Sequence, residues 1–333
     1  MILKQHPEDF IVNEILQLYF DDAGEYTYYQ LTKKNLTTIE AIGKIADIFN
    51  IKISYINFAG TKDKAAVTSQ HISVYKGSSK DLIKEFPQAN AFLHLSFLGK
   101  GKERLNLGSL EGNSFSIIVR EALDNPSKID FIVNYFDDQR FGNNKNNHVV
   151  GKLLIKAKFD EACKIIGLPV EGRNYVKALQ TLHKKTLQMY IHAYQSFLFN
   201  EICKTYVEKK YKKKLKPIEH NLGTLYNVNE KPEKIKNIEI PLIGFGFDFD
   251  TIKDKQLKQI IEQILKQENI YPRDFIIRSL QGFSSEGGTR NLFAKVSNLD
   301  ILQMDEKTYK ITFSLPKASY GTVVIKSMFS SSS

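Results

Sequence analysis

Alternating apolar and polar residues predict strands at both ends of the chain. The segments from Asp9 to Ile15 and from Tyr26 to Leu31 alternate as half-buried strands do. The alternation returns from Tyr309 to Leu315, and an apolar run from Val323 to Ile325 also suggests a strand. Further strands are expected over 53–58 and 66–75 and in glycine-separated pieces between Leu93 and Ala122.

Helix signals are fewer in the N-terminal part. Thr37-Thr38-Ile39-Glu40 forms a capping box that opens a helical pattern, which Asn50 can end. A second helix is predicted from Pro126 to about Phe136, because proline favours the first turn of a helix. The first 142 residues therefore indicate a mixed α/β domain.

The middle of the chain has a different pattern. A polar run follows Gly142, and apolar residues then recur at helical spacing from Lys177 to about Lys214 and again from Leu257 to Leu265. Because strand-like sequence returns afterwards, we expect an α/β (α+β) fold whose mixed, antiparallel sheet domain is interrupted by a mainly helical insertion. The predicted parts are 1–145, 146–299 and 300–333, and the serines from Ser330 onward are expected to form a disordered tail.

The net charge and the cysteine content limit the classes of partner and binding site that the sequence favours. The 333 residues include 47 Lys+Arg and 37 Asp+Glu, a formal net charge of +10, which suggests a polyanionic partner. The two cysteines, Cys163 and Cys203, form no CxxC pair, so a disulfide scaffold or a cysteine-rich zinc site is not expected. No apolar run approaches the ~20 residues that span a bilayer, and a cytoplasmic protein without a membrane segment is expected.

Several common catalytic motifs are absent from the sequence. It contains no GxxxxGK[ST] phosphate loop, no GxGxxG after a strand, no HExxH and no GxSxG, which argues against nucleotide hydrolysis, dinucleotide redox chemistry and zinc proteolysis. The seven histidines have no metal-ligand spacing, so no metal is expected.

One turn combines a carboxylate with two cations. Asp63 stands between Lys62 and Lys64, in a turn between two predicted strands. Neighbouring positive charge should favour the ionised carboxylate, which could act as a nucleophile or a base. Spacing alone favours the simpler interpretation, a hairpin turn with solvated charges.

Five blocks of this sequence occur in a fixed order along the chain. They are Pro7-Glu8-Asp9-Phe10-Ile11-Val12-Asn13-Glu14, Gly60-Thr61-Lys62-Asp63-Lys64-Ala65-Ala66-Val67-Thr68-Ser69-Gln70, Asn134-Tyr135-Phe136-Asp137-Asp138-Gln139-Arg140-Phe141-Gly142, Ser196-Phe197-Leu198-Phe199-Asn200 and Phe313-Ser314-Leu315-Pro316-Lys317-Ala318-Ser319-Tyr320-Gly321-Thr322. Taken together, these blocks resemble the TruD family of tRNA pseudouridine synthases. Residues 205 to 285 carry little that matches. The resemblance covers both ends and the middle of the chain.

The resemblance implies a pseudouridine-synthase catalytic domain interrupted by a family-specific insertion. It implies an isomerase that detaches the base of a tRNA uridine from C1′ and rejoins it through C5, at position 13 in bacterial members. No cofactor is needed, because nothing is oxidised and no phosphate is transferred. The expected partner is tRNA, and the expected state is a monomer.

The resemblance also assigns roles to individual residues. Asp63 is the expected catalytic carboxylate, and Lys4 could pair with it or remain a surface charge. Because an extruded uridine needs flat apolar surfaces and a few polar groups, the expected substrate contacts are Phe10, Asn134 and Tyr320. Phe136 is a secondary member of the same pocket, and Arg140 is expected to bind an acidic neighbour or a phosphate.

The chain departs from the family pattern at four places. Tyr320 replaces a common Phe, Gly321 replaces Ala, and Lys326-Ser327 replaces Arg-Glu. The loss of the acidic residue at Ser327 puts one structural ion pair in doubt. The Asp137-Asp138 pair replaces a glycine-containing pattern and adds negative charge near an expected RNA site.

Two other kinds of function remain open at this stage. One is an RNA-binding or chaperone protein that keeps the fold without chemistry, with the basic stretches Lys209 to Lys216 and Lys100 to Arg104 binding phosphates or remaining solvated. The other is a nucleoside or glycoside hydrolase, which needs a second carboxylate near the first. Asp9 and Glu14 are the candidates for that second carboxylate.

Overall fold

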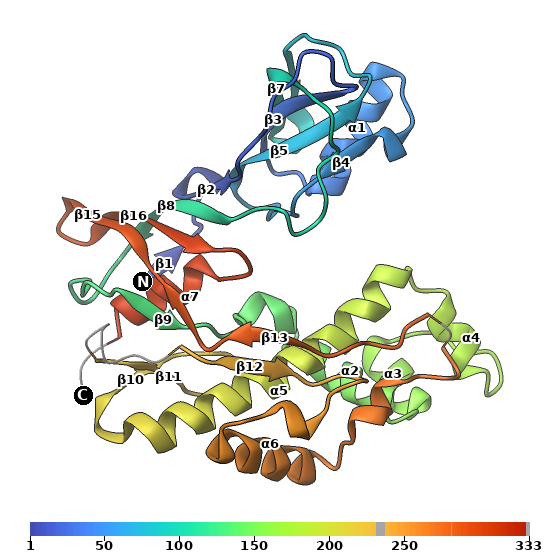
Figure 1. Cartoon of the computed structure of the whole chain (residues 1–333), viewed down its shortest axis with the longest axis vertical. Helices are drawn as coiled ribbons and strands as arrows, with labels where there is room; N and C mark the ends of the chain where they lie inside the picture. The colour runs from blue at the N-terminus through green and yellow to red at the C-terminus, as the bar shows by residue number, and fades with distance from the viewer. Residues whose placement is uncertain (231–236, 281, 331–333) are drawn as a thin grey trace. The chain divides into compact units, whose positions relative to one another are not determined.

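The computed structural model describes residues 1–230, 237–280 and 282–330 (Figure 1). Two compact units make up the chain: Met1–Lys128 with Lys295–Gly321, and Ile129–Ala294 with Thr322–Ser333. The first unit is therefore built from the N-terminal third of the sequence and a segment near its C-terminal end. Apart from Ser330, the predicted disordered tail lies outside the described residues.

A ten-stranded mixed sheet forms the first unit, in agreement with the predicted α/β class. Its main path runs β15-β16-β8-β2-β5-β3-β7-β6, with β1 added beside β8 and β4 beside β5. Strands β2 and β5 pair in parallel, and the other described pairs of this sheet are antiparallel. The strands are β1 (Ile2–Leu3), β2 (Phe10–Ile15), β3 (Tyr26–Lys34), β4 (Ile56–Phe58), β5 (Val67–Tyr75), β6 (Leu82–Phe86), β7 (Ala91–Gly101), β8 (Gly112–Arg120), β15 (Ser297–Asp305) and β16 (Thr308–Pro316).

Helix α1 (Thr38–Phe49) covers one end of this sheet. Thr37 and Glu40 form the predicted capping box, and Asn50 ends the helix in the left-handed conformation that a helix end favours, so both helix boundaries are confirmed. Ile42 and Ile45 pack with strand residues such as Tyr29, Leu31 and Leu93 into one apolar core. This core holds α1 against the sheet, next to the loop of residues 59–66 that precedes β5.

The second unit is mainly helical. Its described α-helices are α2 (Asn147–Ile155), α3 (Phe159–Ile166), α4 (Tyr175–Gln180), α5 (Lys184–Tyr211), α6 (Lys255–Glu268) and α7 (Gly321–Met328), whose first residue belongs to the first unit. The paired strands are β10 (Leu215–Ile218) with β11 (Leu225–Val228), β12 (Glu239–Leu242) with β13 (Gly288–Asn291), and β9 (Phe131–Val133) with β14 (Phe293–Lys295). Helices α4 and α5 confirm the helical pattern predicted from residue 177.

Two predicted elements are wrong. The helix expected from Pro126 to Phe136 is an irregular segment and strand β9, because residues about 160 positions later supply the partner strand β14. The strand expected from Val323 to Ile325 is part of α7, whose three consecutive apolar residues are all buried. A short run that is buried on every side has no periodicity that separates helix from strand.

Short 3-10 helices connect several of these elements. They are Pro7–Asp9, Ile53–Tyr55, Pro87–Ala89, Asp138–Phe141, Lys212–Lys214, Phe249–Thr251 and Pro272–Phe275.

Candidate active site

The loop that carries Asp63 lies at the same edge of the sheet as the chain that enters β2. Strands β2 and β5 pair in parallel with Ile11 opposite Val67, so the segments that lead into both strands meet at one edge. There the Lys4 ammonium lies 2.9 Å from an Asp63 carboxylate oxygen. The Asp63 side chain is 32% exposed, which leaves the carboxylate accessible from solvent.

Buried polar side chains hold the backbone of this loop. Gln70 of β5 donates from Nε2 to the Gly60 carbonyl oxygen at 2.9 Å. The Thr38 hydroxyl donates to Gln70 Oε1 and accepts from the Lys62 N–H, each at 2.9 Å. Both side chains are at most 1% exposed. The sheet and the first turn of α1 therefore fix the loop in advance of any substrate.

The two lysines beside Asp63 in the sequence serve other carboxylates. Lys62 Nζ lies 2.8 Å from Glu14, and Lys64 Nζ lies 3.1 Å from Glu40. Lys4, 59 positions away in the sequence, forms an ion pair with Asp63. The expected pair between Lys4 and Asp63 is therefore present.

Glu14 and Asp9 are both engaged in ion pairs. Burial raises the pKa of Glu14, but hydrogen bonding from His71 and the positive charge of Lys62 outweigh burial and leave that pKa lowered. The Arg120 guanidinium donates to Asp9 at 2.7 and 3.1 Å and lowers the pKa of that carboxyl. A hydrolase acid needs a raised pKa to hold its proton, so neither residue suits the role of general acid beside an ionised Asp63.

Phe10 lies directly beneath the cation that pairs with Asp63. The Lys4 nitrogen is 4.1 Å from the centre of the Phe10 ring, a cation–π distance. The ring is 3% exposed and packs edge-on against Phe115, which in turn stacks on Phe313. Three residues predicted for the site, Lys4, Phe10 and Asp63, are therefore in one cluster.

Tyr320 follows β16 and is partly buried. Its neighbour Gly321 lies against Phe115, and a Cβ atom at Gly321 would stand 2.8 Å from the Phe115 ring. Because real Cβ atoms do not approach so closely, glycine in place of the usual alanine has a steric reason in this chain. The same contact connects the segment of Tyr320 to the aromatic group that holds Phe10.

In the second unit, an arginine that the sequence did not indicate orients Asn134. Arg290 of β13 donates to the Asn134 carbonyl oxygen at 3.1 Å and to its Oδ1 at 2.7 Å. Asn134 Nδ2 donates to the Asn291 carbonyl oxygen at 3.3 Å, and the residue is 5% exposed. Sequence reasoning missed Arg290 because it stands far from the matching blocks and outside any motif.

Phe136 is held by the helix α5. Asn200 of α5 accepts from the Phe136 N–H at 2.9 Å and donates to its carbonyl oxygen at 2.8 Å. The Arg290 guanidinium lies 4.2 Å from the ring centre and that of Arg140 lies 5.2 Å from it. The two matching blocks that contain Phe136 and Asn200 are thus joined by reciprocal hydrogen bonds, and Arg140 contacts an aromatic ring.

The Asp137–Asp138 pair shares a lysine of α7. Lys326 Nζ lies 2.8 Å from Asp137 and 2.6 Å from Asp138, and the Thr322 hydroxyl also donates to Asp137. His220 lies 3.2 Å from Asp138, so two carboxylates and an imidazole converge as metal ligands can. The Lys326 ammonium supplies one positive charge to this group, so both carboxylates of the Asp137–Asp138 departure have a cationic partner.

Ser327, the other half of the Lys326-Ser327 departure, needs no acidic partner. Its hydroxyl donates to the Val323 carbonyl oxygen within α7 at 2.8 Å, and the residue is fully buried.

Both cysteines, Cys163 and Cys203, are buried and form no disulfide. Within the described residues, no helix is both long and apolar enough to cross a membrane.

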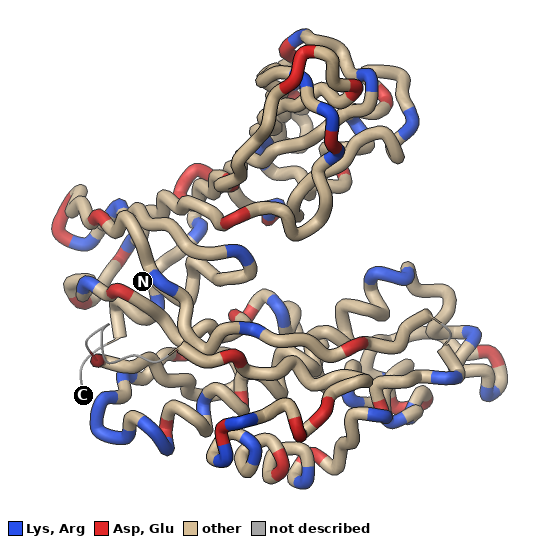
Figure 2. Tube along the Cα trace, in the orientation of Figure 1, with Lys and Arg blue, Asp and Glu red and all other residues tan. Residues whose placement is uncertain are grey.

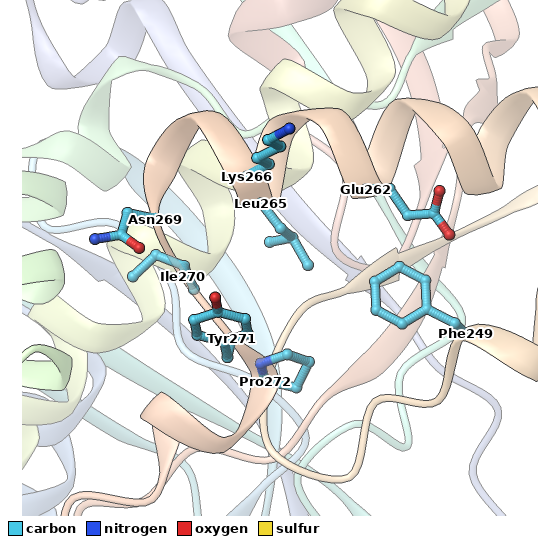
Figure 3. Close-up of a pocket in the computed structure, with 8 residues that line it drawn as sticks. All are labelled: Phe249, Glu262, Leu265, Lys266, Asn269, Ile270, Tyr271 and Pro272. Carbon is cyan, nitrogen blue, oxygen red and sulfur yellow. The ribbon is translucent and has the colours of Figure 1, made fainter.

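A cavity of about 370 Å³ lies beside α6 (Figure 3). Figure 3 shows its wall, which consists of Phe249, Glu262, Leu265, Lys266, Asn269, Ile270, Tyr271 and Pro272. None of the predicted site residues is among them, so the site residues and this cavity are separate features.

This chain belongs to the TruD family of tRNA pseudouridine synthases. The family model described as tRNA pseudouridine synthase D (TruD) matches residues 1–174 and 165–328. The chain is 28% identical to tRNA pseudouridine synthase D of Aquifex aeolicus, with 99% of this chain and 98% of that protein covered. It is 32% identical to the protein of Nanoarchaeum equitans named "Probable tRNA pseudouridine synthase D", again with 99% and 98% covered.

A solved structure supports the fold. The crystal structure of a candidate TruD protein from Methanosarcina mazei has a TM-score of 0.67 and 22% sequence identity, and the match covers 98% of this chain and 93% of that one. At this identity the likeness bears on the fold alone, and it agrees with the mixed α/β architecture described above.

Proposed function

We propose that this protein isomerises uridine 13 of tRNA to pseudouridine, with Asp63 as the nucleophile. The observation that carries the proposal is the Asp63 carboxylate, which is accessible, 2.9 Å from Lys4 and held on a loop fixed by buried hydrogen bonds. A preorganised anion of this kind can attack the sugar C1′ or the uracil ring, or assist proton removal from the sugar. The other expected uridine contacts are Phe10, Asn134 and Tyr320, with Phe136 and Arg140 in supporting roles.

The reaction breaks the bond between C1′ and N1 and forms one between C1′ and C5. The hydrogen on C5 leaves as a proton to solvent, and N1 takes up a proton, so the product is an isomer of the substrate. The bonds balance without an oxidant, a reductant or a phosphate donor. The reaction itself therefore needs no redox cofactor and no phosphate donor. We also propose that the protein acts on tRNA in the cytoplasm, as a monomer and without a metal.

Tritium release tests this proposal directly. With tRNA labelled by tritium at uracil C5, we expect release to plateau at one tritium per tRNA, and the modified base to map to position 13. The matched control is the same tRNA with cytidine at position 13, which should release none. Absence of release by folded protein would reject the enzymatic function in favour of an RNA-binding role, and free uracil in the mixture would indicate hydrolysis.

The basic stretch at the end of α5 is the expected phosphate-binding surface. Figure 2 shows positive charge gathered where α5 ends, and Lys212 and Lys213 there are exposed. Affinity for tRNA should fall as the salt concentration rises, so the slope of log affinity against log salt is negative. In the double variant Lys212→Ser/Lys213→Ser, we expect this slope to become less negative by roughly one for each phosphate that is no longer neutralised. Lys80→Ser/Lys84→Ser, two exposed lysines of the first unit, is the control. Equal slopes for both variants would exclude this surface.

A further inference from the structure

A buried lysine stands behind the loop that carries Asp63. Lys33 of β3 is 0% exposed, and its ammonium donates to the carbonyl oxygens of Leu36 at 2.7 Å, Asp63 at 2.9 Å and, at a longer 3.5 Å, Lys62. In the described part of the chain, no ion pair within 4.0 Å involves this ammonium. Its three hydrogens are therefore directed at backbone carbonyls, two of which belong to the proposed catalytic loop.

Such an arrangement is costly for the fold, since a buried charge loses its hydration. Burial lowers the pKa of Lys33 to about 8, an effect that the Asp63 carboxylate partly offsets. The other charged groups that act on it are Lys62 and, from α1, Glu40. Across the sheet, Lys33 faces the uncharged Thr68 of β5 and Leu93 of β7.

We propose that Lys33 is a positioning residue that, as an ammonium ion, fixes the carbonyls of Lys62 and Asp63 and so aims the Asp63 carboxylate. The inference rests on the proposed role of Asp63 as nucleophile. Loss of the proton removes one of the three donors and the positive charge that favours the ionised carboxylate. Because Lys33 is inaccessible, it acts through the loop and contacts no substrate.

The first test compares Lys33→Met with Lys34→Met. Lys34 is the next residue, and it points instead toward Glu8 at 3.0 Å. We expect Lys33→Met to lower the single-turnover rate of tritium release about 100-fold, since a small misplacement of a reacting group can cost that much. Binding of tRNA should stay within about twofold of the unmodified protein, and Lys34→Met should match that protein in both measurements.

The second test is the pH dependence of the rate. We expect the rate of the unmodified protein to fall as the pH rises through about 8, where Lys33 loses its proton. Lys33→Arg keeps its charge in this range, so its rate should not show that fall.

The contribution of Lys33 to stability should change with pH in the opposite direction to the rate. The pKa of Lys33 is about 8 in the folded protein, whereas its ordinary value of 10.5 applies to the unfolded chain. Between pH 8 and pH 10.5 the unfolded state therefore binds more protons than the folded state. The free energy of unfolding consequently rises with pH in this range. Deprotonation of Lys33 therefore does not itself unfold the protein, and the free energy of unfolding measured over the same pH range separates unfolding from the expected loss of rate.

Two results would overturn the inference: a folded Lys33→Met with the unmodified rate, or a rate profile of the unmodified protein that is flat across pH 8. If Lys33→Met does not fold, the profiles of the unmodified protein and Lys33→Arg decide. Asp63→Asn in the same assay separates the two proposals. Activity in Asp63→Asn would reject the nucleophile itself, whereas its inactivity together with a normal Lys33→Met would reject the role of Lys33 alone.

Discussion

Asp63→Asn should reduce the single-turnover rate of pseudouridine formation by on the order of 10⁴-fold or more, because the amide cannot supply the anion that the reaction needs. The substitution keeps the size of the side chain. Lys4, at 2.9 Å, can still donate a hydrogen bond to the amide oxygen, so the loop should remain folded. The expected result is loss of the chemical step with tRNA binding retained, measured by tritium release and by direct binding of labelled tRNA.

The control for this prediction is Asp22→Asn, which changes an exposed aspartate of the same unit and should leave the rate unchanged. A second comparison is Lys4→Met, which leaves the Asp63 carboxylate in place without its ion-pair partner and should have a smaller effect than Asp63→Asn. Full activity in Asp63→Asn would assign the chemistry to another group. Loss of tRNA binding together with activity would indicate that the substitution disturbed the loop and not the chemical step.

The sequence is sufficient to find the acidic loop, and the family resemblance offers Lys4 as a possible partner, but local spacing does not show which charged residues pair around the loop. The motif around Asp63 combines a turn with the buried Gln70 that holds it, so both lie within one short segment. Charge partners depend on which strands pair. The parallel pairing of β2 with β5 brings in Lys4 from 59 positions away, while Lys62 and Lys64 turn to other carboxylates.

The same limit explains the errors in the fold. Helix α1 was predicted within one residue at each end because its capping box and its left-handed Asn50 are local signals. Strand β9 could not be predicted, because its partner β14 is contributed from more than 150 positions later. Arg290 orients Asn134 through a similarly distant contact. Contacts between residues far apart in the sequence determine strand β9 and the orientation of Asn134, and a local sequence pattern does not predict such contacts.

The second large effect is expected in stability, at the ion pairs of Lys326. Lys326→Met would leave the Asp137 carboxylate, whose side chain is 7% exposed, without its positive partner. Removal of one member of a buried ion pair costs about 3–5 kcal/mol. We therefore expect a clear decrease in the free energy of unfolding at pH 7, measured by chemical denaturation. Lys310→Met, at an exposed position of β16, should have little effect.

The pH dependence of this loss identifies its cause. Burial raises the pKa of Asp137, but the charge of Lys326 and the hydrogen bonds to the carboxylate outweigh burial, so the folded-state pKa lies below the ordinary value of 3.8. A lowered pKa stabilises the fold above the unfolded value, and that contribution is lost as the pH falls through the folded value. In Lys326→Met burial is no longer outweighed, so Asp137 should be protonated at a higher pH than in the unmodified protein. The difference between the two proteins should therefore be largest near neutral pH and narrow as the pH falls toward about 4 and below. Asp137→Asn added to Lys326→Met should restore much of the lost stability, because the more deeply buried carboxylate is then neutral. Asp138, which also loses Lys326, is 26% exposed and keeps more of its hydration. A deficit that stayed constant with pH and resisted this second substitution would instead indicate lost packing of the lysine side chain.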